Sequence, residues 1–320
     1  MDSRTPERGV LRELPRPPHR IAVSVALGVL GFALSWLAQR ASHPAHADWP
    51  LVYHAAHALL AGQDPYAVVR YGPYPLYYPL TAVVPIVPLT AFPLIEAQAL
   101  WVGLGTGVLG YALTARGWWA LLAFASAPCL NAFLLGQWSP LLVGASAVPW
   151  LGFLWATKPT IGLAYLAAWP SRKAVIGVLL LTALSLALDP TWPVRWLAVL
   201  EDPQHIRAPV TRLGGILLLL GLLRWRQPEG RLLATMALVP HTSGPYELVP
   251  LFLVPLTVRE MGILVILSQL AFAVCAVRLT DPTIGLAGII SAQWPVWLAA
   301  VYLPALAMVL RRAPVPMSPR

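Results

Sequence analysis

Long apolar stretches separated by short polar breaks run through the chain from Ile21 to Leu310. Continuous apolar runs of this kind are typical of membrane-spanning helices. The pattern predicts about twelve helices, several of them shorter than the ~20 residues that a perpendicular crossing needs. Their ranges are Ile21–Leu37, Pro79–Phe92, Glu96–Thr114, Trp118–Leu135, Pro140–Trp155, Pro159–Pro170, Ala174–Leu188, Leu213–Leu223, Leu232–Pro240, Leu248–Val258, Gly262–Val277 and Ile284–Leu310. We therefore expect an all-α, polytopic membrane protein in which residues 21–310 form one transmembrane domain. Residues 1–20 would be a basic cytoplasmic tail, and residues 311–320 a second cytoplasmic tail.

Two polar breaks are long enough to hold structure of their own, at residues 39–78 and 189–212. In the first break, apolar residues recur with the spacing of a helix, at Leu51, Val52, Ala55, Ala56, Leu59 and Leu60. Gly62 follows, and glycine is typical of the end of a helix. We expect a short amphipathic helix that lies on the outer face of the membrane.

The composition agrees with a membrane protein. Of the 320 residues, 58% are hydrophobic and only 11% are charged, whereas soluble domains carry about 25% charged residues. The formal net charge of +9 does not indicate nucleic-acid binding, because the basic residues collect at the ends of apolar stretches, where they orient helices and meet anionic headgroups. Cys129 and Cys275 lie inside apolar runs, and we interpret both as packing residues.

The basic residues also predict an orientation. No small-residue cleavage site follows the first apolar run, so we interpret it as a retained helix with a cytoplasmic N-terminus. Alternating the later spans places the dense basic clusters inside, at Arg172-Lys173, residues 224–231, Arg259 and Arg311-Arg312. Most acidic residues fall outside, at Asp48, Asp64, Asp189, Glu201, Asp202, Glu247 and Asp281. The same alternation puts Gly136-Gln137 on the inner side, where we expect a structural role.

Asp48 is the first candidate for chemistry, because it lies in the first outer loop beside an aromatic-rich segment. As a general base its carboxylate could take a proton from a hydroxyl that attacks another group. The competing interpretation is a cap for the following helix, with Pro50 in the first turn. A lone acidic residue in a loop favours the cap slightly.

Aromatic residues follow in the same loop. Gly62-Gln63-Asp64-Pro65-Tyr66 has the composition of a helix stop and a turn. Tyr66, Tyr71, Tyr74, Tyr77 and Tyr78 then form a cluster. Interfacial tyrosines are expected at any membrane surface, but such a cluster could also stack on a sugar or line a groove for a prenyl chain. We name Asp64, Tyr66 and Tyr78 as candidate substrate-binding residues.

Histidines in this loop raise the possibility of a metal site. His54 and His57 share one helical face, and His43 and His46 have the same spacing. Solvated histidines at the membrane interface are the simpler interpretation, so we predict no metal. We keep His54 and His57 as candidate substrate-binding residues.

Three basic residues outside the first loop complete the candidate site. Lys158 has an outer position where a lysine is not expected, and could hold a lipid phosphate; snorkelling toward headgroups is the alternative. Arg207 lies on the second outer loop and could join Lys158 on that phosphate. His241 lies in a polar break on the same side as Asp48.

Taken together, these segments resemble glycosyltransferase family 87, the polyprenyl-phosphate-mannose-dependent mannosyltransferases of the GT-C class. The resemblance rests on four pieces in order: Asp48 with Tyr53-His54-Ala55-Ala56 and Leu60-Ala61-Gly62-Gln63-Asp64-Pro65-Tyr66; Tyr78-Pro79-Leu80 with Pro85 and Pro88; Leu135-Gly136-Gln137; and Lys158-Pro159. It covers residues 45–175, and the last third departs from the family's pattern.

The resemblance implies a GT-C fold with about twelve transmembrane helices in a cell membrane, that of a bacterium in our interpretation. It implies an extracytoplasmic active site in which Asp48 acts as the base of an inverting sugar transfer. The donor would be a polyprenyl-phosphate hexose, with mannose the family's best-known sugar, and the acceptor a lipid or glycan of the cell envelope. No cofactor is implied, since the donor is not a nucleotide sugar and no bound metal is typical.

Two other classes of function remain open. A transporter or flippase could use the same polar residues as a substrate path, although transporters usually place ionisable residues near the bilayer midplane. A non-catalytic membrane partner in envelope assembly would keep most of the same motifs.

Overall fold

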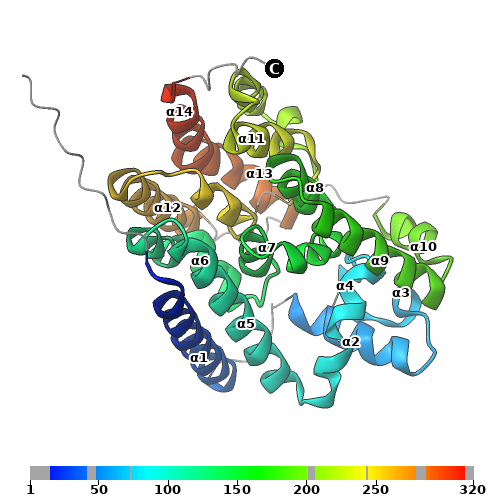
Figure 1. Cartoon of the computed structure of the whole chain (residues 1–320). Helices are drawn as coiled ribbons and strands as arrows, with labels where there is room; N and C mark the ends of the chain where they lie inside the picture. Colours follow the sequence, from blue (N-terminus) through cyan, green and yellow to red (C-terminus); the bar gives the residue numbers. More distant parts are fainter. Residues whose placement is uncertain are drawn as a thin grey trace, which may run out of the picture.

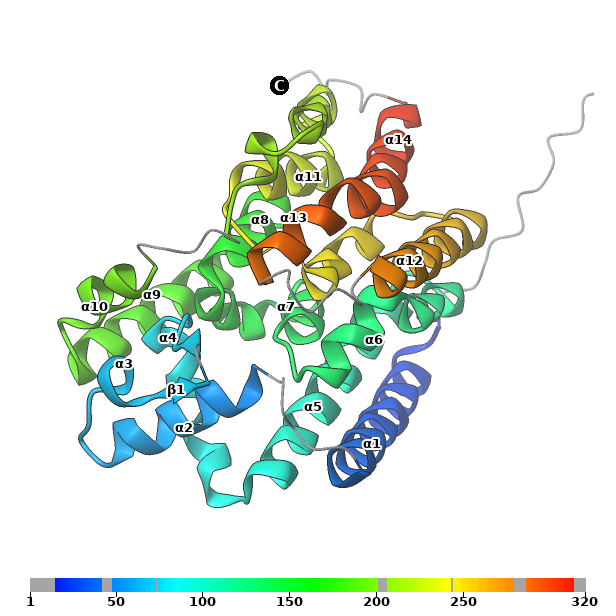
Figure 2. The same cartoon turned by 180° about the vertical axis from the view of Figure 1, so that it is seen from behind.

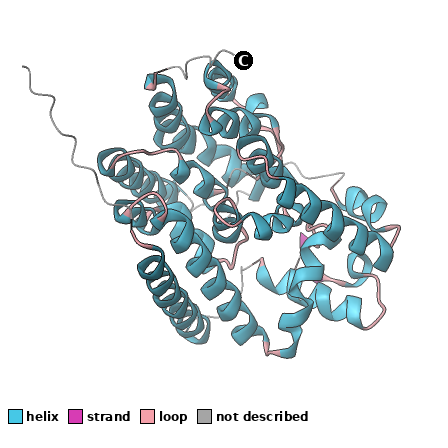
Figure 3. Ribbon diagram, in the orientation of Figure 1, coloured by secondary structure: helices cyan, strands magenta, loops and turns pink. Residues whose placement is uncertain are grey.

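The computed structural model describes residues 15–41, 48–72, 74–200, 206–242, 244–278 and 286–313. These residues are predominantly helical with almost no sheet, as Figure 3 shows, and confirm an all-α architecture. The α-helices are α1 (Pro17–Ala41), α2 (Trp49–Leu60), α3 (Pro65–Val68), α4 (Leu80–Val83), α5 (Leu94–Thr114), α6 (Ala127–Leu134), α7 (Ser139–Ala145), α8 (Pro159–Ala168), α9 (Arg172–Leu188), α10 (Trp192–Val199), α11 (Pro228–Leu238), α12 (Val258–Arg278), α13 (Leu286–Trp297) and α14 (Leu303–Arg311).

Short 3₁₀ helices, which are wound more tightly than an α-helix, and one wider π-helix connect the α-helices. The 3₁₀ helices are η1 (Val84–Ala91), η2 (Trp118–Ala125), η3 (Pro149–Thr157), η4 (Pro209–Thr211), η5 (Gly215–Arg224) and η6 (Pro245–Leu253), and η7 (Leu298–Tyr302) is a π-helix. Strands β1 (Arg70–Tyr71) and β2 (Tyr74–Pro75) pair antiparallel, with Tyr71 opposite Tyr74. Many predicted spans are therefore broken: the apolar run at residues 118–135, for example, forms η2 and α6 instead of one helix.

Three helices among the described residues are long and apolar enough to cross a membrane: Pro17–Ala41, Val258–Val277 and Ala292–Arg311. Two further crossings are added if the bent pairs Leu80–Ala91 with Leu94–Thr114 and Arg172–Leu188 with Trp192–Val199 each count as one span. Their lengths and apolar composition indicate a membrane-embedded protein. Leucines and valines of α1 and α9 are widely exposed, as lipid-facing helices require.

Helices α1 and α5 pack side by side in both views of the molecule (Figures 1 and 2). Glycines permit the close approach, because a Cβ on Gly103 would lie 2.8 Å from the Gly28 carbonyl oxygen, and one on Gly107 would lie 3.1 Å from that of Ser24. Small residues at such an interface are typical of membrane helices.

The ends of α1 and α5 show that the two helices are antiparallel. Near the start of α1, the Arg20 guanidinium donates to the Tyr111 carbonyl oxygen over 2.9 Å. Near its end, Arg40 pairs with Glu96 at 3.5 Å. Helix α5 therefore begins at the end of the molecule where α1 finishes.

This arrangement corrects the predicted order of crossings. The run at residues 79–92 does not cross to the Arg20 end, because Phe92 accepts a 2.8 Å hydrogen bond from Tyr53 of α2. Its helices α4 and η1 turn by 118° into α5 instead. The break lies at Phe92 and Pro93: Phe92 is extended, and Pro93 is the N-cap of α5. A residue before proline favours this extended conformation, so the helix ends there.

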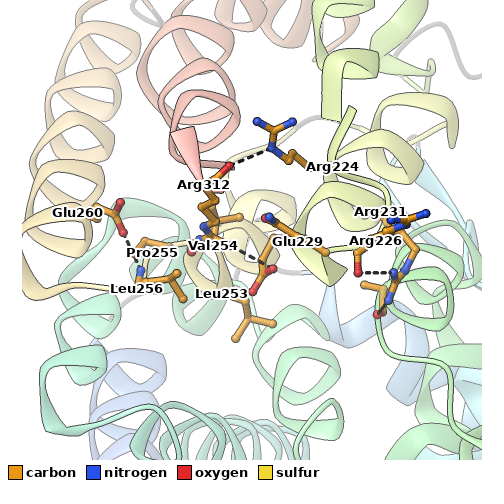
Figure 4. A network of polar contacts seen from close by, with 12 residues as sticks. Arg224, Arg226, Glu229, Arg231, Leu253, Val254, Pro255, Leu256, Glu260 and Arg312 are labelled. Atoms are coloured by element: carbon orange, nitrogen blue, oxygen red, sulfur yellow. Dashed lines mark hydrogen bonds and ion pairs between the residues drawn. The ribbon is translucent and has the colours of Figure 1, made fainter. Parts of the chain in front are cut away.

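Arginines hold the Arg20 end of the molecule together by donating to carbonyl groups at helix ends. Arg116 donates to Leu253 and Pro255, and Arg231 to Ala167 and Ala168. Figure 4 shows the centre of this network, where Arg312 pairs with Glu229 at 3.0 Å and Arg224 donates to the Arg312 carbonyl oxygen. Basic clusters that lie far apart in the sequence are thus gathered at one end, as the positive-inside pattern predicts.

At the opposite end, the two predicted outer loops meet. Helices α2, α3, α4 and α10 gather there (Figures 1 and 2). Arg195 of α10 pairs with Asp64 at 2.7 Å and also with Asp189. The indole of Trp196 donates to the Tyr77 carbonyl oxygen over 2.9 Å. The second loop therefore braces the first.

The helix predicted in the first outer loop is present as α2, but its apolar face does not lie on a membrane surface. Trp49, Leu51, Val52, Ala55 and Ala56 are all buried in the protein core. The apolar periodicity of α2 therefore reflects packing against η1 and α4 rather than contact with lipid.

Candidate active site

Asp48 lies directly before α2, but its side chain does not cap the helix. The carboxylate Oδ2 instead accepts hydrogen bonds from the Gln137 amide and, at 3.4 Å, from the Tyr78 hydroxyl. The interpretation of Asp48 as a helix cap is therefore wrong. Its carboxylate is turned toward side chains that come from distant parts of the chain.

Two tryptophans fix the segments that carry this contact. Trp49 follows Asp48 and Trp138 follows Gln137, and both pack on Trp101 of α5, with ring-centroid distances of 5.3 and 4.4 Å. All three indoles are buried. Because the residues next to Asp48 and Gln137 are anchored on one side chain, the two polar groups are held together.

Burial raises the pKa of Asp48 above its usual value of 3.8, and the hydrogen bond from Gln137, the charge of Lys158 and the Tyr78 hydroxyl oppose that rise. Glu247 adds to it by like-charge repulsion. Asp48 nevertheless keeps part of its surface exposed. A carboxylate that holds a proton more tightly than in water has the basicity that a general base needs.

The position of Gln137 contradicts the prediction from the sequence. The alternation of spans places it on the side opposite Asp48, yet the two side chains are hydrogen bonded. The error follows from counting residues 79–92 as a crossing. The sequence did indicate a turn at this point, because Gly136-Gln137 interrupts an apolar region and glycine before a polar residue is typical of a turn. It did not indicate on which side of the membrane the turn lies.

Tyr78 connects this contact to the rest of the first loop. Its hydroxyl lies 3.5 Å from the Gln137 amide oxygen, and its carbonyl oxygen accepts a hydrogen bond from the Tyr66 hydroxyl at 3.2 Å. Burial, followed by the charge of Asp48, raises the pKa of Tyr78 well above its usual value. Tyr78 therefore stays protonated and can donate.

A chain of buried polar groups lies next to Asp48. Lys158 Nζ is 2.8 Å from Glu247 Oε1, and His241 Nδ1 is 2.8 Å from Glu247 Oε2. The Tyr302 hydroxyl lies 3.4 Å from His241 Nε2, and Lys158 Nζ lies 4.8 Å from the centroid of the Tyr246 ring. Lys158 thus has a carboxylate partner and does not snorkel toward headgroups.

Glu247 is charged in spite of its surroundings. Burial alone would raise its pKa, but the ion pair with Lys158 and the contact with His241 bring the pKa well below its usual value of 4.5. A carboxylate that is 1% exposed needs such partners. The importance of Glu247 could not be derived from the sequence, where it is one of several acidic residues predicted outside.

Arg207 touches this cluster through its backbone, and Asp64 has its contacts elsewhere. Arg207 is joined to His241 through the backbone, with a 3.4 Å hydrogen bond to its carbonyl oxygen, and its side chain is exposed. Asp64 accepts from the Tyr66 amide and pairs with Arg195. Its contacts brace the loops, and a role in binding substrate stays a prediction.

His54 and His57 are exposed on α2, where their rings contact that of Tyr53. They face away from the buried side of the helix. In the described ranges, no group of three or more His, Cys, Asp or Glu side chains could hold a metal ion. His43 and His46 lie outside those ranges.

The sequence-predicted residues Asp48, Tyr78, Lys158 and His241 therefore converge, together with Gln137, Glu247, Tyr246 and Tyr302. The cluster holds the Asp48 carboxylate and, beside it, a lysine and a histidine that both pair with Glu247. Such a set can accept a proton and stabilise an anion nearby. Comparison with protein-family models, curated proteins and solved structures finds no match to this chain.

Proposed function

We propose that this chain is a membrane glycosyltransferase that moves a hexose from a polyprenyl phosphate to a hydroxyl of an envelope lipid or glycan. The observation that carries the proposal is the carboxylate of Asp48, which is held by Gln137 and Tyr78 instead of capping α2. The resemblance of the four sequence pieces to glycosyltransferase family 87 supports the same reaction, with mannose as the sugar.

In the proposed reaction, Asp48 takes the proton of the acceptor hydroxyl while the hydroxyl oxygen attacks the anomeric carbon of the donor. The bond between that carbon and the phosphate oxygen breaks, its electron pair leaves with the polyprenyl phosphate, and the configuration inverts. The phosphate needs no strong acid to leave, but its charge needs compensation. Lys158, which is 14% exposed, and the exposed Arg207 could provide it.

We further propose a GT-C fold in the cell membrane, with fewer transmembrane helices than the twelve predicted because residues 79–92 do not cross, and with the Asp48 cluster on the extracytoplasmic side. The gathering of arginines at the other end of the molecule supports this orientation, because basic residues favour the cytoplasmic side. The donor, its acceptor and membrane lipids would be the partners. The proposed chemistry uses no cofactor.

One observation favours a second function. Lys158, Glu247 and His241 form a buried ionisable chain, and such groups inside a membrane protein also mark proton or substrate paths in transporters and flippases. In that case, Asp48 would take up and release protons as part of transport and would not act as the base of a sugar transfer.

The test uses membranes that contain the wild type, Asp48→Asn or Glu260→Gln, with radiolabelled polyprenyl-phosphate mannose and total envelope lipids. Glu260→Gln is the matched control, because the Glu260 carboxylate accepts from the Leu256 amide at the opposite end of the molecule. We expect transfer by the wild type and the control, and a loss of at least about 10³-fold in Asp48→Asn. Full activity in Asp48→Asn would refute the role of Asp48.

The same preparations, reconstituted in vesicles, separate the two functions. Movement of the labelled lipid between leaflets, with no transfer from a panel of polyprenyl-phosphate sugars, would replace the transferase by a flippase.

A further inference from the structure

We propose that Gln137 is a positioning residue for Asp48, because its amide fixes one oxygen of the carboxylate and leaves the other to receive the acceptor proton. This inference rests on the proposed function and adds a residue to it. Both hydrogen bonds that the described residues make to Asp48 end on Oδ2, from Gln137 and from Tyr78. Oδ1 is then the oxygen available to a substrate.

The surroundings of Gln137 define the orientation of its amide. The amide nitrogen donates to the Asp48 carboxylate, which can only accept. The amide oxygen lies 3.5 Å from the Tyr78 hydroxyl, which shares its one proton between this oxygen and Asp48 Oδ2. A flipped amide would place two oxygens against each other at the carboxylate. Gln137 is 4% exposed, so solvent does not compete for either contact.

The backbone at Gly136 holds this amide in place. Gly136 has a φ of +61° at the turn after α6, a conformation that favours glycine. A Cβ there would lie 3.2 Å from the Trp49 Cβ and 3.1 Å from the Gln98 amide nitrogen. The turn that carries Gln137 is thus packed directly against the residue that follows Asp48.

This contact favours the ionised form of Asp48 against its burial. A hydrogen bond from a neutral amide to a carboxylate stabilises the charge. The other groups that act on Asp48 are the cation Lys158, the hydroxyls of Tyr78 and Tyr246, and the anion Glu247. Without the Gln137 amide, the carboxylate would bind its proton more tightly and lose its fixed orientation.

The first experiment does not depend on activity. The fraction of Asp48 modified by dicyclohexylcarbodiimide, which reacts with protonated carboxyl groups, is measured against pH by mass spectrometry of the full chain in native membranes. We expect the midpoint of labelling to rise by about one pH unit in Gln137→Leu. In Gln137→Glu, which keeps the shape of the side chain, a carboxyl faces Asp48, and the midpoint should rise further.

Gln269→Leu is the matched control, because Gln269 donates to the Ala125 carbonyl oxygen far from the cluster. Its midpoint should equal that of the wild type. Unchanged midpoints in both Gln137 variants would overturn the inference, and the near-isosteric Glu variant keeps that result interpretable if the Leu variant folds poorly.

The second experiment measures transfer with the same variants. A positioning role predicts that kcat of Gln137→Leu falls by about 10–100-fold with KM unchanged, and that the acidic limb of the pH–rate profile moves with the labelling midpoint. Equal activity and an unshifted profile would overturn the inference. A shifted labelling midpoint without transfer by the wild type would keep the coupling of Gln137 to Asp48 and discard the transferase reaction.

Discussion

Lys158 and Glu247 form a buried ion pair, with 2.8 Å between Nζ and Oε1. Lys158 lies at the junction of η3 and α8, and Glu247 lies in the first turn of η6. The pair therefore joins the middle of the chain to its last third, beside Asp48. Removing one member leaves the other buried with its charge partly uncompensated, which is costly in a low-dielectric interior.

We predict that Lys158→Met destabilises the protein by about 3 kcal/mol. Thermal unfolding in detergent, followed by circular dichroism, should show a lower midpoint. The control is Lys173→Met at the other lysine of the chain, whose ammonium lies over the Trp150 ring at 4.4 Å, and its midpoint should move little.

A second change tests the cause of this loss. The double variant Lys158→Met, Glu247→Gln no longer buries an unpaired carboxylate, so it should recover part of the stability. If the losses in free energy of unfolding of Lys158→Met and Glu247→Gln simply add in the double variant, the contact between the two side chains does not itself stabilise the fold.

Acid should weaken the same pair. The partners of Glu247 lower its pKa in the folded protein, so the unfolded chain binds the proton more readily. The stabilisation is complete above the usual value of 4.5 and is lost as the pH falls from there toward the lowered pKa. We expect wild type and Glu247→Gln to differ most near neutral pH and to converge in acid, as measured by unfolding midpoints between about pH 7 and pH 3.

Asp48 should have the opposite dependence. Burial raises its pKa in the folded protein, so its ionisation costs stability as the pH rises from the usual value of 3.8 through the raised value. Asp48→Asn should therefore be more stable than the wild type at neutral pH, and this advantage should vanish in acid. An Asn variant that is less stable at neutral pH would show that the ionised carboxylate stabilises the fold, and would contradict the raised pKa of Asp48.

The sequence predicted the helical class, the helix that carries Leu51 to Leu60, and four site residues that lie together in the structure: Asp48, Tyr78, Lys158 and His241. These features depend on local periodicity and on which residues interrupt apolar runs, both of which are visible in a sequence. The position of Gln137 was wrong, because it depends on the number of crossings that come before it. Residues 79–92 bend by 118° instead of crossing. Counting them as a crossing therefore reverses the predicted side of each later loop, until a second miscounted span reverses it again.

The partners of charged side chains were also hidden. Lys158 was expected to face a lipid phosphate, but it pairs with Glu247, which is distant in the sequence. Likewise, the apolar face of α2 has the pattern of a surface helix, and only the tertiary structure shows that protein covers it. Periodicity identifies a buried face without identifying what buries it.

The corrected order of crossings is testable with two matched cysteines. Ala91 and Ala115 are both exposed and flank α5, and the native cysteines Cys129 and Cys275 are buried. We expect a membrane-impermeant maleimide to label Ala91→Cys in intact cells and Ala115→Cys only after the membrane is opened. The reverse result would restore residues 79–92 as a full crossing and separate Gln137 from Asp48.

Arg195 links the two outer loops, and we predict that its removal loosens both of them. Its guanidinium pairs with Asp64 of the first loop and with Asp189 at the end of α9, where α9 and α10 meet at 97°. Arg195→Ala should release α10 from α3, and amide hydrogen exchange should become faster in both helices while α1 and α5 remain protected. Arg226→Ala is the control, because Arg226 lies over the Trp225 ring at the opposite end, and its exchange in α3 and α10 should match that of the wild type. If Arg195→Ala speeds exchange in α10 alone, the second loop depends on Arg195, but the first loop, and with it the segment that leads to Tyr78, is held by its own core.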